Sequence, residues 1–290
     1  MGYKLNEPIM LSVLAAKLKY EWKGVDIKIE SVSSSDTAVE SDLTFSKQPV
    51  QDTAGVAVIA AISDSSPIFE FSGVLVSENP RLTFIKALNF LVSEIGFSTW
   101  NSPSVIHPSA KIGQNVVIED GCYIGANTII EHNVVLHAGT RIGENSRIRS
   151  CSSIGGDGFG FERLQDGMPL RFPHIGGVVI GNNVEIGSCT AVARGTLSDT
   201  VIEDNVKIDN LVHIAHNCLV KNGAFVIACA EISGGVEVGR NSWIAPNSCT
   251  HQKIVIGEEA IVGLGAVVTK DVPSKSVYAG NPAKKIRDIS

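Results

Sequence analysis

Aliphatic residues recur at every sixth position over much of this chain. The first run of this spacing loses its phase over residues 155–173, returns at Ile180, and is shifted by four residues after Val192. It then continues to Val268, with Thr250 as the single departure. The positions are Ile106, Ile112, Ile118, Ile124, Ile130, Leu136, Ile142, Ile148, Ile154, Ile180, Ile186, Val192, Ile202, Ile208, Ile214, Val220, Val226, Ile232, Val238, Ile244, Thr250, Ile256, Val262 and Val268. An α-helix needs a period near 3.6 and an exposed strand a period of two, so the spacing predicts neither.

Glycine often follows the aliphatic residue, and a small residue often stands four places after it, which permits a tight corner. This pattern resembles the hexapeptide repeat of the left-handed parallel β-helix, in which three hexads form one triangular coil. The run then predicts a mainly β fold of about eight coils. The left hand is implied by the resemblance, since parallel crossovers are otherwise right-handed. A fold of this kind can also be a non-catalytic binding scaffold.

Residues 1–100 lack the period of six and predict a small α/β domain. We expect a helix over residues 11–19, strands over 27–32, 56–61 and 73–76, and a second helix through residue 95 that begins at Pro80. Asn79 is its expected N-cap. The predicted domains are an α/β nucleotide-binding domain over residues 1–101, a β-helix acyltransferase domain over 102–273, and a short basic C-terminal tail over 274–290. The glycine-rich stretch at 155–160 is expected to begin an inserted loop.

Composition narrows the possible functions. The 290 residues are 44% hydrophobic but only 6% aromatic, which favours an aliphatic core, and the net charge of −6 argues against a nucleic-acid partner. There is no apolar run long enough to span a membrane and no signal-peptide pattern, so we expect a cytoplasmic protein. The six cysteines form no CxxC pair and are interpreted as small core residues, neither disulfide-bonded nor zinc-binding.

Four motifs carry a resemblance to a more specific family. Residues 42–45 and 74–81, together with residues 154–161 and 208–217 of the repeat, resemble the UDP-3-O-acylglucosamine N-acyltransferases of lipid A assembly. The resemblance implies a homotrimer that transfers an acyl group from acyl-CoA or acyl-ACP (acyl carrier protein) to the amine of a nucleotide-linked amino sugar. The product would serve lipopolysaccharide or other surface glycan synthesis. No bound cofactor and no metal are implied.

The same resemblance assigns individual residues. His216 matches the catalytic histidine, Gly234 the backbone oxyanion donor, and Phe45 the aromatic residue that stacks on the base. Substrate-binding positions fall on Gln48, Asp209 and Asn210. The family usually has Asn in place of Gln48, Tyr in place of Gln51 and Asp in place of Ala193, so we expect a nucleotide-sugar that differs from the usual one. The alternative is the UDP-3-O-(3-hydroxyacyl)glucosamine N-acyltransferase reaction with acyl-ACP.

The chemistry of amide formation fits these assignments. A neutral amine must lose a proton as it attacks a thioester, and histidine is a suitable base near neutral pH. Gly234 lies 18 residues after His216, one coil on, so its N–H is expected about 5 Å along the same face. There it would stabilise an oxyanion. His251, 35 residues after His216, is expected at the edge of the same cleft, against the donor or the sugar phosphate.

The C-terminal region bears on the acyl donor. The chain continues only briefly past the repeat, whereas the family usually adds C-terminal helices that meet acyl carrier protein. Residues 280–284 resemble instead the ending of coenzyme A-dependent hexapeptide acyltransferases, which favours an acyl-CoA donor. Five cations could attract its phosphates: Lys270, Lys275, Lys284, Lys285 and Arg287.

Another class of β-helix enzyme would use zinc. It resembles the γ-class carbonic anhydrases, and catalytic zinc usually takes three protein ligands. The segment that follows His251 supplies no further histidine, which argues against this class.

Overall fold

The computed structural model describes residues 2–47, 55–61 and 70–289. The chain divides into two compact units. The N-terminal unit comprises Met1–Thr99 together with Gly160–Ile175, and the solenoid unit comprises Trp100–Phe159 together with Gly176–Ser290. Within the described residues no helix is both long enough and apolar enough to cross a membrane.

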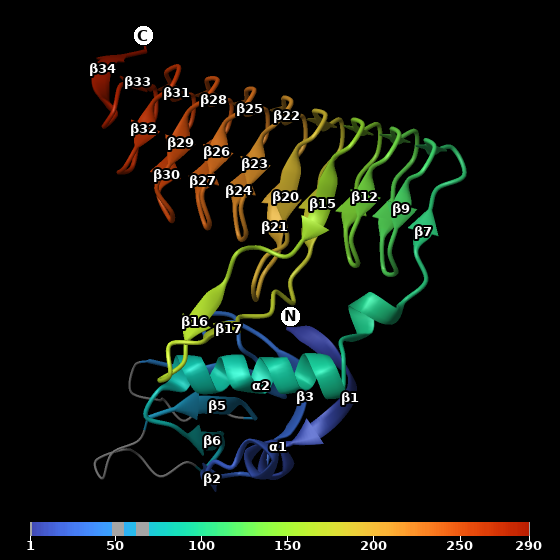
Figure 1. Ribbon diagram of the computed structural model, residues 1–290, viewed down its shortest axis with the longest axis vertical. Coiled ribbons are helices and arrows are strands. Elements are labelled where there is room, and N and C mark those ends of the chain that lie inside the picture. The colour runs from blue at the N-terminus through green and yellow to red at the C-terminus, as the bar shows by residue number, and fades with distance from the viewer. Residues whose placement is uncertain (1, 48–54, 62–69, 290) are drawn as a thin grey trace. The chain divides into compact units, whose positions relative to one another are not determined.

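The N-terminal unit contains a mixed six-stranded sheet in the order β1-β3-β4-β5-β6-β2 (Figure 1). Its four central strands are parallel, and both edge strands are antiparallel to their neighbours. The strands are β1 (Tyr3–Met10), β2 (Trp22–Gly24), β3 (Lys28–Val32), β4 (Asp42–Phe45), β5 (Ala57–Ala60) and β6 (Gly73–Val76). The sequence pattern predicted β3, β5 and β6 to within a residue or so, but neither the central strand β4 nor the two edge strands.

Both predicted helices of this unit are confirmed, as α1 (Leu11–Leu18) and α2 (Pro80–Glu94). The side chain of Asn79 caps α2 by accepting a hydrogen bond from the Leu82 N–H at 3.1 Å. Phe84, Leu88 and Leu91 of α2 are fully buried. The helix is therefore held by its cap and by its apolar face.

The inserted segment is not wholly a loop. It forms a hairpin of β16 (Phe161–Arg163) and β17 (Pro169–Arg171) that belongs to the N-terminal unit and contacts α2. The Asn89 amide donates to the Arg171 carbonyl at 2.9 Å, and Arg81 forms an ion pair with Glu162 at 2.7 Å. Phe172 lies edge-on to Phe84 with ring centroids 6.3 Å apart. Contacts with residues distant in sequence thus hold the hairpin in place. The glycine content of the segment could not have predicted these contacts.

The solenoid unit confirms the mainly β hexapeptide fold. Short parallel strands stack into three faces of a triangular coil (Figure 1). The first face has β7 (Val105–Ile106), β10 (Tyr123–Ile124), β13 (Arg141–Ile142), β18 (Val178–Ile180), β21 (Thr200–Ile202), β24 (Leu219–Val220), β27 (Glu237–Val238) and β30 (Val255–Ile256). The second face has β8 (Lys111–Ile112), β11 (Ile129–Ile130), β14 (Arg147–Ile148), β19 (Glu185–Ile186), β22 (Lys207–Ile208), β25 (Phe225–Val226), β28 (Trp243–Ile244), β31 (Ile261–Val262), β33 (Ser276–Ala279) and β34 (Lys284–Asp288). The third face has β9 (Val117–Ile118), β12 (Val135–Leu136), β15 (Ser153–Gly156), β20 (Ala191–Ala193), β23 (His213–Ile214), β26 (Glu231–Ile232), β29 (Cys249–Thr250) and β32 (Val267–Val268).

The period of six is the register of this stack. Ile124 pairs with Ile142, and Ile214 pairs with Ile232, so each aliphatic residue lies on its equivalent in the next coil. From Ile124 onward the aliphatic side chains form one continuous buried core, whereas Ile106 and Ile112 of the first coil are exposed. Thr250 keeps the same inward position and is only 6% exposed. The core therefore tolerates one polar hexad position.

Glycine after the aliphatic residue reflects the closeness of neighbouring coils. A Cβ atom added to Gly125 would lie 2.6 Å from the carbonyl carbon of Gly143 in the next coil, so a side chain there would push the coils apart. At other corners asparagine supplies the left-handed backbone, as at Asn145 and Asn247, with φ of 54° and 56°.

The region expected to be a C-terminal tail is instead part of the second face. Strand β33 adds to β31 in parallel, and β34 returns antiparallel to β33. The backbone of Ala283 also donates to the carbonyl of Val267 at 2.8 Å. The basic residues of this segment are therefore carried on sheet structure.

Candidate functional site

A cavity of about 420 Å³ opens on the third face of the solenoid. Four lining residues come from strands of this face, namely β20, β23, β26 and β29, and the others come from the turns beside it. The lining consists of Gly158, Phe159, Ala193, His213, Ala215, His216, Glu231, Ser233, Gly234, Thr250, His251 and Gln252. Three residues that the sequence placed in one site, His216, Gly234 and His251, thus line one cavity.

The hydrogen bonds around His216 fix the position of its proton. Nδ1 lies 2.9 Å from the Asn217 Oδ1, which already accepts from the Thr196 backbone N–H at 3.1 Å and from the Thr196 hydroxyl at 2.7 Å. The Asn217 amide nitrogen donates to the Ser198 hydroxyl at 2.7 Å. Because Oδ1 can only accept, the His216 Nδ1 carries the hydrogen. In a neutral His216 the Nε2 is therefore the nitrogen without a hydrogen, as a general base requires.

Gly234 lies directly against the imidazole of His216. A Cβ atom added to Gly234 would be 2.8 Å from the His216 Cε1 and 2.9 Å from Nε2, so a side chain there would displace the ring. The Gly234 N–H forms no hydrogen bond within the described residues, while its carbonyl accepts from the Lys253 N–H at 3.0 Å. An unused N–H beside the base is a suitable donor to an oxyanion.

His251 lies at the edge of the cavity and is exposed. Its Nδ1 donates to the Gln252 carbonyl at 3.0 Å, because a carbonyl can only accept. This leaves the His251 Nε2 as an acceptor, so the neutral ring can hold a hydroxyl or amide hydrogen of a bound substrate.

Asp209 and Asn210 do not line this cavity. The Asp209 carboxylate accepts from the backbone N–H groups of Asn210 and Ala228, at 2.7 and 3.3 Å, and the Asn210 side chain accepts from the Ser188 N–H at 2.7 Å. Asp209 lines a separate cavity of about 320 Å³ beside Phe225 and Trp243. In this chain both residues stabilise the corners of successive coils.

Phe45, the predicted stacking residue, ends strand β4 of the N-terminal unit. Its half-buried ring lies 4.8 Å from that of Phe84, measured between centroids. Gln48 and Gln51 lie outside the described residues. The role of Phe45 in stacking on a base stays a prediction.

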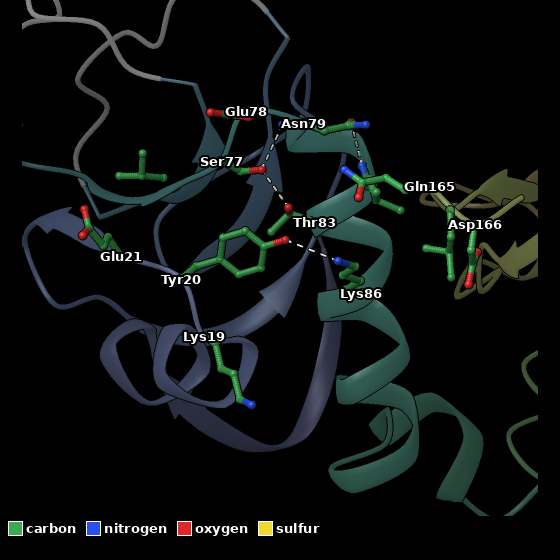
Figure 2. A pocket seen from close by; sticks show the side chains of 13 residues that line it. Lys19, Tyr20, Glu21, Ser77, Glu78, Asn79, Thr83, Lys86, Gln165 and Asp166 are labelled. Atoms are coloured by element: carbon green, nitrogen blue, oxygen red, sulfur yellow. Dashed lines mark hydrogen bonds between the residues drawn. The ribbon is translucent and has the colours of Figure 1, made fainter. Parts of the chain in front are cut away.

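A larger cavity of about 720 Å³ in the N-terminal unit lies between the ends of α1 and β6, the start of α2 and the β16–β17 turn (Figure 2). Its polar side chains partner one another: Ser77 with Thr83 at 2.7 Å, and Lys86 with the Tyr20 hydroxyl at 3.5 Å. In Figure 2 Lys19 and Glu21 diverge from these pairs. Phe45 does not belong to its lining, so its size does not make it the base site.

Asn217 is a candidate site residue to which the sequence had assigned no role. Its partners Thr196 and Ser198 come from the segment between β20 and β21, where the repeat is shifted by four residues. The shift was visible as a break in the period. A break in a regular repeat beside a candidate base is a signal that could have identified this segment.

The buried Arg194 begins that same segment. Its guanidinium donates to the carbonyls of Gly155 and Ala138 at 2.6 and 2.9 Å, and its Nε lies 3.8 Å from the Asp157 carboxylate. These contacts hold the start of the glycine-rich stretch whose Phe159 lines the His216 cavity.

Cys218 lies next to the site but is not a nucleophile. Burial raises the pKa of its thiol to about 11, and the Sγ lies 3.2 Å from the Ser233 carbonyl. The thiolate is the reactive form of cysteine, so this side chain is inert near neutral pH. Among the described residues there is also no group of three His, Cys, Asp or Glu side chains that could hold a metal ion.

Comparisons with known proteins agree with the fold. The model of the bacterial transferase hexapeptide (six repeats) matches residues 103–138 and 121–156. The solved structure of LpxA from Acinetobacter baumannii is 28% identical, with a TM-score of 0.56 over 64% of this chain and 73% of that chain.

Curated relatives cover nearly the whole chain. The UDP-3-O-acylglucosamine N-acyltransferase of Campylobacter lari is 34% identical over 96% of this chain and 94% of its own length. That of Campylobacter curvus is 35% identical over 93% and 92%, and that of Helicobacter pylori is 34% identical over 91% and 86%. The chain is therefore an acyltransferase that belongs to the UDP-3-O-acylglucosamine N-acyltransferase family.

Proposed function

We propose that the protein transfers an acyl group from a thioester to the amine of a UDP-linked 3-O-acylglucosamine in lipid A biosynthesis. The observation that carries the proposal is the His216 imidazole, which Asn217 orients through Nδ1, in contact with Gly234 in one cavity. The full-length similarity to the Campylobacter enzymes favours this reaction over the broader class of nucleotide-sugar acylation.

The reaction begins when the substrate amine attacks the thioester carbonyl. The His216 Nε2 takes a proton from the attacking nitrogen, and the carbonyl oxygen becomes an oxyanion that the Gly234 N–H stabilises. The tetrahedral intermediate collapses with cleavage of the carbon–sulfur bond. The imidazolium returns the proton to the thiolate, so that amide and thiol leave and His216 is neutral again. Throughout, Asn217 holds the ring through Nδ1–H.

Nucleotide recognition is assigned to the N-terminal unit. Phe45, supported by Phe84, offers a ring face to the base. Two positions differ from the usual family residues that contact the base and the sugar. Gln48 stands where the family usually has Asn, and Ala193 lines the cavity where the family usually has Asp. The sugar and the base are thus expected to make some contacts peculiar to this chain.

The acyl donor is proposed to be a thioester of acyl carrier protein or of coenzyme A. The alignment with the Campylobacter lari enzyme covers 94% of that protein, so the short C-terminal region does not set this chain apart from it. This weakens the sequence argument for coenzyme A. Lys284 and Lys285 of β34 are exposed, as are Lys270 and Lys275 before β33, and they suit either an acidic carrier protein or the phosphates of coenzyme A.

We also propose a homotrimer. Apolar side chains remain exposed on the coil faces of the solenoid unit, among them Val117, Phe225 and Trp243, at 52%, 38% and 42%. The rings of Phe225 and Trp243 lie 5.6 Å apart on the second face. Association of three copies would remove such surface from water.

The test is steady-state kinetics with UDP-3-O-acylglucosamine and matched acyl-ACP and acyl-CoA donors. His216→Ala is expected to lower kcat by about 10²–10⁴ with little change in KM for the nucleotide-sugar, because only the general base is lost. Phe45→Ala is expected to raise that KM and leave kcat nearly unchanged. His107→Ala, an exposed histidine of the first coil, is the control. Turnover of His216→Ala within about threefold of wild type, in a protein of unchanged mass in solution, would exclude the mechanism.

A further inference from the structure

Three side chains on the third face form a hydrogen-bonded relay away from the His216 cavity. Glu119 follows β9, His137 follows β12, and Ser153 begins β15. These three strands are neighbours in one sheet (Figure 1). The His137 Nδ1 lies 3.1 Å from the Glu119 Oε1, and the Nε2 lies 3.2 Å from the Ser153 hydroxyl. None of the three lines the His216 cavity.

The partners fix the direction of this relay. The other carboxylate oxygen of Glu119 accepts from the Ala138 N–H at 2.9 Å, which holds the carboxylate in place. A carboxylate can only accept, so the His137 Nδ1 carries the hydrogen and Nε2 is the acceptor. The Ser153 hydroxyl therefore donates to Nε2. A hydroxyl that donates to an imidazole oriented by a carboxylate is the arrangement of an activated serine nucleophile.

The backbone beside this serine leaves it accessible. A Cβ atom added to Gly156 would lie 3.4 Å from the His137 Nε2 and 3.7 Å from the Ser153 Oγ, which is ordinary van der Waals contact, so Gly156 adjoins the pair without crowding it. Ser153 is half-buried and the His137 side chain is 28% exposed. A reagent can therefore reach the hydroxyl from the outer surface of the coil.

We propose that Ser153 is a second acyl-accepting site, a serine nucleophile activated by His137 and Glu119 that reacts with acyl esters and thioesters. The choice of an acyl thioester as the natural reagent rests on the proposed function, whereas the activated hydroxyl does not. Strand β15 is separated from β23 by β20 alone, so Ser153 lies about 10 Å along the axis from the strand that precedes His216.

The step is an ordinary acyl transfer. The Ser153 Oγ forms a bond to the thioester carbonyl carbon while its proton passes to the His137 Nε2. The carbon–sulfur bond then breaks, and the imidazolium protonates the leaving thiolate. Water, activated by the same Nε2, hydrolyses the resulting serine ester to a free acid and regenerates Ser153.

The test uses two probes on the full-length protein: an alkyl fluorophosphonate and a long-chain acyl-CoA. Intact-mass analysis is expected to show one phosphonyl adduct that maps to Ser153 and is absent from Ser153→Ala. His137→Ala and Glu119→Gln should slow labelling, the former by about 10²–10⁴. His216→Ala should label at the wild-type rate, which separates this site from amide formation. Release of thiol from acyl-CoA without any amine, lost in Ser153→Ala, would extend the activity to thioesters.

A matched control exists in the first coil. The Ser109 hydroxyl lies 2.9 Å from the His107 Nδ1, so this pair also joins a serine to a histidine. The same nitrogen lies 3.2 Å from the Ser109 backbone N–H, whereas the His137 Nδ1 faces a carboxylate. Ser109→Ala is expected to leave labelling unchanged. Absence of a Ser153 adduct in wild type, or labelling of folded His137→Ala at the wild-type rate, would overturn the proposal and leave the relay as a structural ladder. If the fluorophosphonate labels Ser153 but acyl-CoA releases no thiol, thioesters are excluded as reagents and the activated serine is still supported.

Discussion

The solenoid unit and the N-terminal unit are stabilised in different ways. In the solenoid each residue of the core contacts its equivalents in the neighbouring coils, as Ile232 does through its pairing with Ile214. In the N-terminal unit β1 pairs with β3, and β2 pairs with β6 about fifty residues away in sequence. The structure of a repeat can therefore be predicted from short stretches of sequence, and a break in the repeat can indicate a functional segment. A mixed sheet has no regular sequence spacing against which such a break could be recognised.

The largest effect that tests this comparison is loss of a core side chain. Ile232→Ala in the solenoid and Leu88→Ala in the N-terminal unit each remove a fully buried residue and should lower the free energy of unfolding by about 2–5 kcal/mol. Amide hydrogen exchange should separate them. The solenoid variant should lose protection mainly in the coils next to β26, whereas the other should lose it across the whole six-stranded sheet. A uniform loss in both would erase the distinction.

A smaller effect concerns the buried thiol beside His216. Because burial raises the pKa of Cys218 to about 11, the unfolded chain releases this proton at a lower pH than the folded protein does. Stability from this group is complete below about pH 9 and is lost as the pH rises toward 11, by about 2–3 kcal/mol. Urea melts of wild type and Cys218→Ala at pH 8 and pH 10.5 measure it. Equal losses in the two proteins would assign the pH dependence to other groups.

The smallest effect tests the N-terminal unit alone. Asn79→Ala removes the acceptor for the Leu82 N–H and should cost about 1 kcal/mol, while Asn79→Asp should keep most of the stability. Thermal melts of the two variants decide the point. A cost in Asn79→Asp equal to that in Asn79→Ala would show that the cap contributes nothing measurable.

The parts of the fold that sequence predicted are those set by nearby residues. The period of six located the solenoid coils, and Asn79 with Pro80 located α2. The hairpin β16–β17 could not be predicted, because its order comes from Asn89 and Arg81 of α2. The C-terminal strands were also missed, since their pairing with β31 has no counterpart in the hexad spacing.

The candidate site likewise contains residues that the sequence predicted and residues that it did not. Coil arithmetic placed His216 and Gly234 side by side, because 18 residues make one turn of the stack. It could not supply Asn217 as the partner of His216, because the conformation of residues 194–199 depends on where the shifted repeat resumes. The relay of Glu119, His137 and Ser153 could not be predicted from the sequence for another reason. Its members are ordinary polar residues at outward positions, and only three-dimensional register aligns them.

The closing hairpin of the second face bears on how a stack of this kind ends. A parallel coil presents unpaired backbone groups that could template another coil or another molecule. Here β34 is the outermost strand of that face, and it runs antiparallel with Lys284, Lys285 and Arg287 along it. An antiparallel strand that carries several positive charges is a poor template for further parallel strands. The segment whose cations are proposed to attract the acyl donor should therefore also disfavour end-to-end association of two solenoids.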